Sequence, residues 1–538
     1  MKEPTLRGAV EKPIGVVTAT SQPTEFQFIV NSGVTRPVLQ DFVVVEHPNA
    51  PRVPVLAKVV RLSRNVPTAH AGKGAPAPEP KAKRDTVAAF CNVIGALDRS
   101  GRFRGTGFPV EPGATVYRPS ANFLNQVLGG DDPGELHLGH LRNRPDVPVA
   151  VKANELLNKH VAVLAMTGAG KTYATSVLLE ELMRRGYPLL IIDPHGDYIG
   201  LGEGRHTNFK ISNGRRGKYN LKVFEGALAL SAYGWSEFVE FVDNLSEEHG
   251  TPAQREILRQ AYERTVKTEH ESTAAFLDAM TRNMKKVPGV PATTLAAVQR
   301  RLAFMREQLG GVEADLTLDK IREALGPGRG AVLSLAQLPA PLQRNMVAHI
   351  VQRLFDQRKL FVTGSSRQQV PPTMIVVEEA HNFAPSAAAD EHAASRSPLR
   401  RIATEGRKFG VSLCVISQRP SALDATVLSQ CNSQIILRVV NPNDQQRIAQ
   451  SVDSLAREDI FSLPDLSQGE AMVSGTMVRV PTVLKIRKRF SPEGIPTKNR
   501  LRELGEVRYK RERAPKPKRR KRAARKTRTR RRARRRKR

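Results

Sequence analysis

Residues 165–172, AMTGAGKT, have the composition of a phosphate-binding loop. Gly168 and Gly170 allow backbone N–H groups to turn toward the phosphates of a nucleotide. Lys171 supplies a positive charge, and the hydroxyl of Thr172 can ligate Mg²⁺. The residues expected to bind nucleotide from this motif are Gly168, Ala169, Gly170, Lys171, Thr172 and Tyr173. The sequence therefore predicts ATP and Mg²⁺ as cofactors.

Ala165 departs from the common pattern G-x-x-x-x-G-K-[ST], which begins with glycine. This position is where the strand enters the loop, so we expect its methyl group to be accommodated. The apolar run before the loop predicts a strand, and the run after Lys171 has apolar residues at helical spacing. A chance match on a glycine-rich turn is the alternative, and the strand and helix context argues against it.

Two adjacent carboxylates follow a second apolar run, in the segment TMIVVEEAHNF at 373–383. A strand that ends in acids delivers them to the crevice where α/β sheets bind ligands. We expect Glu379 to polarise the attacking water and Glu378 to hold hydrated Mg²⁺. Glutamate is one methylene longer than the usual aspartate, which favours coordination of the metal through water. The alternative is a strand end with solvated acids.

Asp193 and Gln418 also end apolar runs, in LIIDPHGDY and VSLCVISQRP. Asp193 ends the strand that follows the loop helix, so we expect that strand beside the loop strand. Its carboxylate either supports the water or metal, or forms a turn before Pro194. Gln418 can sense the γ-phosphate by hydrogen bonding, with a plain strand terminus as the alternative.

Four basic residues precede the strand that ends at Gln418: Arg400, Arg401, Arg407 and Lys408. One arginine from a neighbouring subunit can neutralise the charge that develops on a transferred phosphoryl group. For any single one of these residues, a solvated basic helix face is an equal alternative.

The elements that must position these residues change type along the chain. From about residue 160, strand-like and helix-like runs alternate, which is typical of a parallel α/β sheet. A mostly helical block interrupts this pattern at 235–325, and short β-like runs before about residue 118 predict a small all-β unit. The predicted units are an N-terminal all-β unit at 1–120 with a flexible insertion at 68–85, a core at 121–490 that contains the helical insertion, and a basic disordered tail at 491–538.

Charge is the most unusual property of the composition. The 538 residues carry a net charge of +33, which indicates an anionic partner. Between Tyr509 and Arg538, 20 residues are basic and one is acidic, so this tail is a polycation. The three cysteines fit neither a disulfide framework nor a zinc site, and no apolar run approaches the length of a membrane span. We therefore expect a cytoplasmic protein without a membrane partner.

Together these motifs resemble those of the archaeal HerA family, hexameric DNA-translocating ATPases. The resemblance covers roughly residues 10–490, and its specific parts are AVLAMTGAGKT, IIDPHGDY, VVEEAHNF, EGRKFG, ISQRP and GEAMVSGTMVRVPTVLKI. Family members commonly have alanine at the head of the loop and a doubled acid in the second motif. The resemblance implies a RecA-like P-loop NTPase core with an inserted helical bundle and an N-terminal small β-barrel.

The resemblance also implies roles for residues outside the loop. It selects Arg407 as the arginine that acts in the neighbouring subunit's site, and it implies nucleotide contacts for Lys159, Gly475 and Thr476. The catalytic set is then Lys171, Glu379, Asp193, Gln418 and Arg407. The β-barrel is expected to stack subunits and to dock a nuclease of the NurA type.

The function implied is a ring that moves along double-stranded DNA and resects broken ends with a nuclease. One alternative is a DNA pump of the FtsK or conjugation type, which usually carries membrane-spanning segments. Another is a non-catalytic DNA-binding protein whose assembly is controlled by nucleotide; the presence of both Lys171 and Glu379 argues against it. For the tail we expect non-specific binding of DNA or RNA, with a solubilising or partner-binding extension as the alternative.

Overall fold

The computed structural model describes residues 5–65, 86–98, 102–129, 134–202, 220–226, 229–230, 233–246, 249–268, 270, 272–309, 316–390 and 393–491. The insertion predicted at 68–85 lies outside the described residues. So does the predicted tail at 491–538, apart from Ser491.

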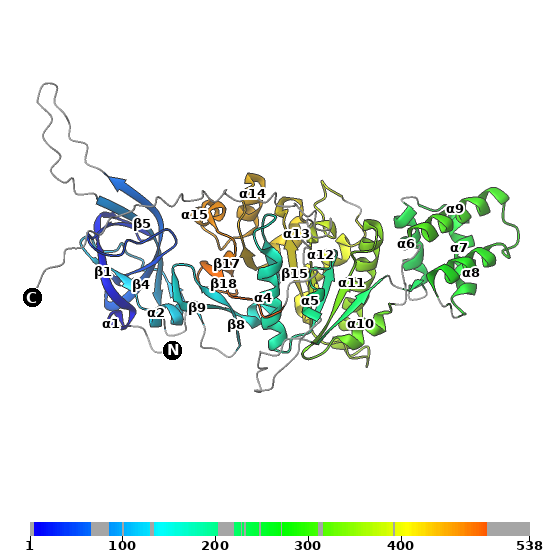
Figure 1. The fold of residues 1–538 in the computed structure, drawn as a ribbon, viewed down its shortest axis with the longest axis horizontal. Helices are drawn as coiled ribbons and strands as arrows, with labels where there is room; N and C mark the ends of the chain where they lie inside the picture. Colours follow the sequence, from blue (N-terminus) through cyan, green and yellow to red (C-terminus); the bar gives the residue numbers. More distant parts are fainter. Residues whose placement is uncertain are drawn as a thin grey trace, which may run out of the picture. The chain divides into compact units, whose positions relative to one another are not determined.

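The N-terminal region forms a closed barrel of antiparallel strands (Figure 1). Within the described residues, six strands follow one another around it in the order β2-β1-β7-β3-β4-β5, and pairing of β2 with β5 closes it. Their bounds are β1 Val10–Ser21, β2 Glu25–Val30, β3 Phe42–His47, β4 Ala50–Asn65, β5 Thr86–Leu97 and β7 Thr115–Pro119; the short β6, Phe103–Arg104, pairs with β5. The small all-β unit expected from the alternating runs is confirmed, and so is the small β-barrel that the resemblance implies.

The second sheet carries the phosphate-binding motif. In the described part of the chain it has the order β12-β13-β11-β14-β15-β10-β16-β17-β18-β8-β9. Its strands are β8 Glu135–Leu141, β9 Arg144–Lys152, β10 Val161–Leu164, β11 Leu189–Asp193, β12 Asn220–Glu225, β13 Arg329–Ser334, β14 Thr373–Val377, β15 Val411–Ser417, β16 Ser433–Ile436, β17 Glu470–Gly475 and β18 Thr482–Ile486. The strands from β12 to β16 in this order are parallel, so their carboxyl ends share one edge. The predicted α/β class is confirmed.

Both faces of the parallel strands are buried, which explains their continuous apolar runs. Side chains alternate between two cores because successive residues of a strand point to opposite faces. Val161 and Val163 of β10 belong to the core that contains α4, whereas Ala162 and Leu164 belong to the core that contains α11. The helices near this sheet and the barrel are α1 Leu6–Ala9, α2 Ala121–Leu128, α3 Ala153–Asn158, α4 Lys171–Arg184, α5 Ile199–Gly202, α10 Leu318–Ala324, α11 Ala340–Val362, α12 Arg396–Glu405, α13 Ala425–Ser429, α14 Pro442–Ser451 and α15 Arg457–Ser462.

Four helices lie together between β12 and β13 in the sequence (Figure 1). They are α6 Trp235–Ser246, α7 Pro252–Thr265, α8 Thr273–Met284 and α9 Ala292–Gln308. The rings of Phe238, Tyr262 and Phe276 pack against one another at centroid distances of 4.9–6.3 Å. The hydroxyls of Thr251 and Ser272 cap the amino ends of α7 and α8, so each helix begins at a defined residue.

A buried ion pair joins the barrel to the C-terminal part of the core. Lys58 Nζ of β4 lies 2.6 Å from Asp459 Oδ1 of α15, and both side chains are at most 6% exposed. Gln40 Nε2 donates to the same carboxylate oxygen at 3.2 Å. These residues are more than 400 positions apart in sequence, so they fix how the barrel meets this helix.

We expect Asp459→Ala to lower the free energy of unfolding by about 3 kcal/mol, because the Lys58 ammonium then stays buried without a carboxylate. Urea denaturation of the full chain measures this, with the exposed Asp453→Ala as control. The double variant Lys58→Met/Asp459→Leu removes both charges and should recover most of the loss. A double variant as unstable as Asp459→Ala would contradict this explanation.

Candidate active site

The loop between β10 and α4 is held by the strands on both sides of β10. Ala165 N donates to Ser417 O of β15 at 3.2 Å, and Met166 N donates to Arg438 O beyond β16 at 2.9 Å. Ala165 is fully buried in the core with α4, so its methyl group is accommodated as predicted. The loop therefore starts at a fixed place between two strand ends.

Gly168 and Gly170 have φ values of +79° and +97°, which side-chain-bearing residues rarely adopt. A Cβ added at Gly168 would meet no atom within 4 Å, so this part of the loop faces open space. Helix α4 begins at Lys171, and its first N–H groups have no partner inside the helix. Such donors at the positive end of a helix fit a phosphate group.

Lys171 bridges the two glutamates at the end of β14. Its Nζ lies 2.7 Å from Glu378 Oε1 and 2.5 Å from Glu379 Oε1. Glu379 has φ 47° and ψ 48°, a left-handed conformation that is costly for glutamate. Because this conformation turns successive side chains to one side, both carboxylates reach the loop lysine.

Burial and charge act in opposite directions on this cluster. Burial would lower the pKa of the Lys171 ammonium, but the carboxylates of Glu378 and Glu379 raise it above its ordinary value. Burial raises the pKa of the fully enclosed Glu378 carboxyl, against the effect of Lys171. Tyr198 Oη also donates to Glu378 Oε2 at 2.7 Å. Glu378 therefore has an ion pair with Lys171 at one oxygen and a hydrogen bond from Tyr198 at the other.

Glu379 keeps one oxygen available. Within the described residues, its buried Oε2 has no hydrogen-bond partner. His381 Nδ1 lies 3.4 Å from this oxygen and 3.2 Å from Ser417 Oγ. Burial lowers the pKa of His381, which favours the neutral ring. A buried carboxylate oxygen without a hydrogen bond, beside a phosphate loop, is suitably placed to bind and deprotonate a water molecule.

Asp193 holds together the turn that follows β11. Its Oδ1 accepts the N–H groups of His195, Gly196 and Asp197, and its Oδ2 accepts that of Tyr198. The carboxylate is fully buried and accepts four N–H groups of this turn, which favours the turn-forming alternative.

The expected place of β11 beside β10 is wrong. β11 pairs with β13 and β14, and β15 separates β14 from β10. The connection through α4 therefore crosses over two strands before the chain re-enters the sheet.

Asp197 is the acid of this segment that approaches the loop. Its Oδ2 lies 3.5 Å from Thr172 Oγ1. No group of three or more His, Cys, Asp or Glu side chains suited to a metal exists among the described residues. A few oxygen donors suit Mg²⁺, which keeps several waters and takes further ligands from phosphates. Thr172, Asp197 and Glu378 are the residues that would hold such an ion, which would lower the negative charge of the phosphates.

Gln418 contacts the phosphate loop directly. The chain leaves β15 at Ser417, and Thr167 Oγ1 donates to Gln418 Oε1 at 2.5 Å. The glutamine side chain therefore lies on the same edge as Lys171 and Glu379, and that location suits a group that responds to the γ-phosphate.

Four predicted residues lie at the opposite edge of the sheet: Lys159, Arg407, Gly475 and Thr476. Val161, the first residue of β10, pairs with Ser433 of β16, and Ser433 pairs with Gly475 of β17. Gly475 therefore lies at the same height in the sheet as the amino end of β10. Arg407 lies in the turn Gly406–Phe409, just before β15 begins. β10 alone spans about 13 Å at the usual rise per residue. One chain therefore does not bring these residues to its own loop.

Their local contacts on this edge are well defined. Lys159 Nζ pairs with Glu155 Oε2 at 2.9 Å. A Cβ at Gly475 would lie 2.0 Å from Asn432 O, so glycine is required there by close backbone packing. Thr476 N donates to the same Asn432 oxygen at 2.9 Å. Arg407 is exposed, and no ion pair of its side chain is found within the described residues.

A phosphate loop that faces strand-end glutamates and a strand-end glutamine, on a parallel sheet, defines an α/β P-loop ATPase. The family described as "Helicase HerA, central domain" matches residues 136–354. A probable helicase of Methanocaldococcus jannaschii is 30% identical over 411 residues, 73% of this chain and 74% of that protein. The chain belongs to the HerA helicase family.

Other known proteins are similar as well. A protein of Pyrococcus furiosus named "DNA double-strand break repair helicase HerA" is 28% identical over 450 residues, 75% of this chain and 78% of that protein. The solved structure of VirB4 of Thermoanaerobacter pseudethanolicus has a TM-score of 0.46 at 15% identity, covering 67% of this chain and 98% of that one. None of the helices described for this chain has the length and apolar character needed to cross a bilayer.

We expect Glu379→Gln to keep nucleotide binding but to lower ATP hydrolysis by about 100-fold or more, because an amide cannot accept the proton of the attacking water. Phosphate release and the binding of a fluorescent ATP analogue measure the two effects. Glu263→Gln on the exposed face of α7 is the matched control. A Glu379→Gln protein that hydrolyses ATP at the normal rate would remove the catalytic role.

Proposed function

We propose that this protein is an ATP-driven translocase of double-stranded DNA, which assembles as a ring and acts with a nuclease of the NurA type on broken ends. Family membership supports this, since related proteins of several archaea are named DNA double-strand break repair helicases. The moderately basic body of the chain supports sequence-independent contacts with DNA phosphates.

The observation that carries the proposal is the separation of the site over two edges of one sheet. Lys171, Glu379 and Gln418 lie at the carboxyl edge, and Arg407 lies exposed at the amino edge. Subunits that pack head to tail in a ring bring one edge against the opposite edge of the next subunit. ATP then lies between subunits, and Lys159, Gly475 and Thr476 reach it from the same neighbour as Arg407.

The other arginines of this segment have partners within their own chain. Arg400 Nη2 donates to Thr426 Oγ1 at 3.2 Å, and Arg401 Nη1 pairs with Asp356 Oδ1 at 2.9 Å. Arg407 lacks a comparable partner among the described residues, which favours it as the group offered to the neighbouring subunit.

The residues have distinct tasks in this proposal. Bound ATP supplies the γ-phosphoryl group, and its Mg²⁺ lowers the negative charge around that group. Lys171 turns from the glutamates to the phosphates, which leaves Glu379 available to orient and deprotonate water. Gln418 bonds to the loop through Thr167 and thus moves with it. The neighbour's arginine neutralises developing charge and links hydrolysis to movement between subunits.

Mixing two inactive proteins tests the trans role of Arg407. Arg407→Ala and Lys171→Ala should each reduce ATP turnover by about 1000-fold, since an arginine finger contributes about 10³ or more. Mixed rings should recover turnover, because some sites combine an intact Lys171 with an intact neighbouring Arg407. Arg401→Ala, which keeps Arg407, is the matched control and should stay active. Mixtures that never recover would indicate that Arg407 acts within its own chain.

Removal of residues 509–538 tests the role of the basic tail. Phosphate contacts release counterions, so the deletion should make the dependence of DNA affinity on salt less steep. Affinity for a duplex, measured by fluorescence anisotropy at several salt concentrations, gives the slope. ATP turnover without DNA should be unaffected. An unchanged slope would mean that the tail does not contact DNA.

A further inference from the structure

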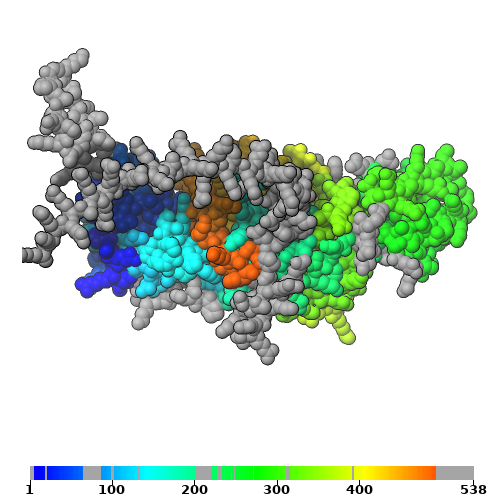
Figure 2. Space-filling view, viewed as in Figure 1, coloured from blue at the N-terminus to red at the C-terminus, as the bar shows by residue number. Residues whose placement is uncertain are grey.

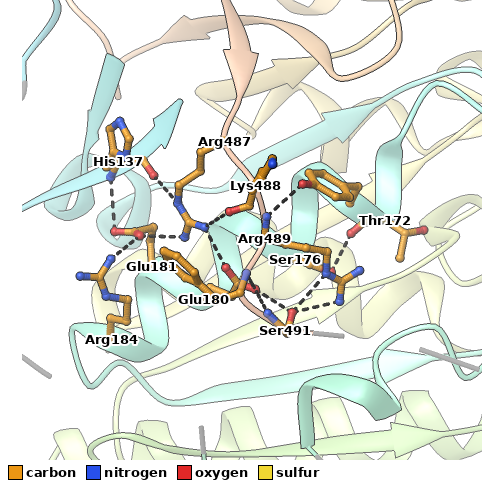
Figure 3. Close-up of polar contacts among 12 residues, drawn as sticks. His137, Thr172, Ser176, Glu180, Glu181, Arg184, Arg487, Lys488, Arg489 and Ser491 are labelled. Atoms are coloured by element: carbon orange, nitrogen blue, oxygen red, sulfur yellow. Dashed lines mark hydrogen bonds and ion pairs between the residues drawn. The ribbon is translucent and has the colours of Figure 1, made fainter. Parts of the chain in front are cut away.

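Residues 487–491, called the strap here, follow β18 and lie along α4 (Figure 3). Arg487 Nη1 lies 3.0 Å from Glu180 Oε2, and Arg487 Nη2 lies 2.8 Å from Glu181 Oε1. Glu180 Oε1 also accepts Phe490 N, Ser491 N and Ser491 Oγ at 2.6–2.8 Å.

These contacts make the strap a fixed part of the α4 surface. Glu180 and Glu181 are at most 2% exposed, and buried carboxylates are stable only when they are paired and hydrogen-bonded. Arg487 and the strap backbone satisfy that requirement. Two fixed points, at Arg487 and at Ser491, therefore hold the residues between them in one conformation.

The strap reaches the first turn of the helix that begins the phosphate site. Arg489 N donates to Tyr173 Oη at 3.0 Å, and Arg489 Cζ lies 6.0 Å from the centre of the Tyr173 ring. Tyr173 directly follows Thr172, and it lies two helical turns before Glu180 on the same face. Arg489 Nε and Nη2 also donate to Ser491 Oγ, which orients the guanidinium group.

The strand order indicates on which side of β10 the nucleoside of a bound ATP would lie. The γ-phosphate end is marked by Glu379 and Gln418, which follow β14 and β15 on one side of β10. On the other side of β10 lie β16, β17 and β18, and the strap continues from β18. A Cβ at Gly170 would lie 3.8 Å from Gly469 N, so the turn before β17 adjoins the loop. This side of the loop is therefore where the nucleoside of a bound ATP would lie.

We propose that Tyr173 and Arg489 form the contact surface for the base and ribose of ATP. The guanidinium and phenol groups offer flat faces, which suit a nucleoside. The inference deepens the proposed function and rests on the loop as its nucleotide site. It assigns a binding task to a segment outside the phosphate-binding motif.

Comparing ADP with inorganic pyrophosphate tests the assignment, since only ADP has a nucleoside. Titration calorimetry of the full chain without DNA should show that Arg489→Ala binds ADP about tenfold more weakly and binds pyrophosphate as the unaltered protein does. Arg489→Ala keeps the main-chain N–H that bonds to Tyr173, so the strap should stay in place. Tyr173→Ala should give the same pattern, Lys171→Ala should weaken both ligands, and Arg457→Ala at an exposed position of α15 should change neither.

Equal weakening of ADP and pyrophosphate by Arg489→Ala would overturn the proposal, because the strap would then act on the phosphates or on the fold. Unchanged affinity for both ligands would overturn it as well. Tyr173→Phe keeps the ring and serves if Tyr173→Ala does not fold; it should lose less ADP affinity than Arg489→Ala. These measurements need neither DNA nor ATP turnover. Their result is therefore independent of whether the protein moves along DNA.

Discussion

The ion pairs of Lys171 with Glu378 and Glu379 are the constraint on which the structure of the site depends. They place the phosphate loop, the end of β14 and the left-handed backbone of Glu379 in one arrangement. Tyr198 fixes Glu378 from the other side, and the Asp193 turn positions Tyr198. The phosphate groups of a nucleotide would offer that lysine an alternative set of anions.

The parallel sheet places the candidate site residues in two separate groups. Because its strands share a direction, everything that follows a strand meets at one edge and everything that precedes a strand meets at the other. Glu379 and Gln418 belong to the first group, and Arg407 and Lys159 belong to the second. A single chain separates these groups by the length of β10, and the proposed ring would bring the groups of neighbouring subunits together. The strap is a third group of residues. It continues from the antiparallel part of the sheet and contacts α4, the helix that follows the phosphate loop.

The phosphate loop, the paired glutamates and Gln418 were predictable from sequence because each depends on local patterns: glycines at fixed spacing, or a polar residue after an apolar run. The position of β11 was misjudged because no local pattern encodes strand order. Pro194 and Gly196 were the available signal for the turn that Asp193 forms. Asp197 and His381 lie within the motifs IIDPHGDY and VVEEAHNF, but only the folded chain shows their contacts. The strap pairs residues about 300 positions apart, so no sequence spacing indicates it.

ATP turnover per chain, measured across protein concentrations together with particle mass by light scattering, tests the split site most directly. The account predicts that turnover per chain is low where the 59.3 kDa chain is monomeric and rises as multimers form, because only then does an Arg407 meet another chain's Lys171. A monomer that hydrolyses ATP as fast as the assembled protein would contradict it, since one chain would then contain a complete site.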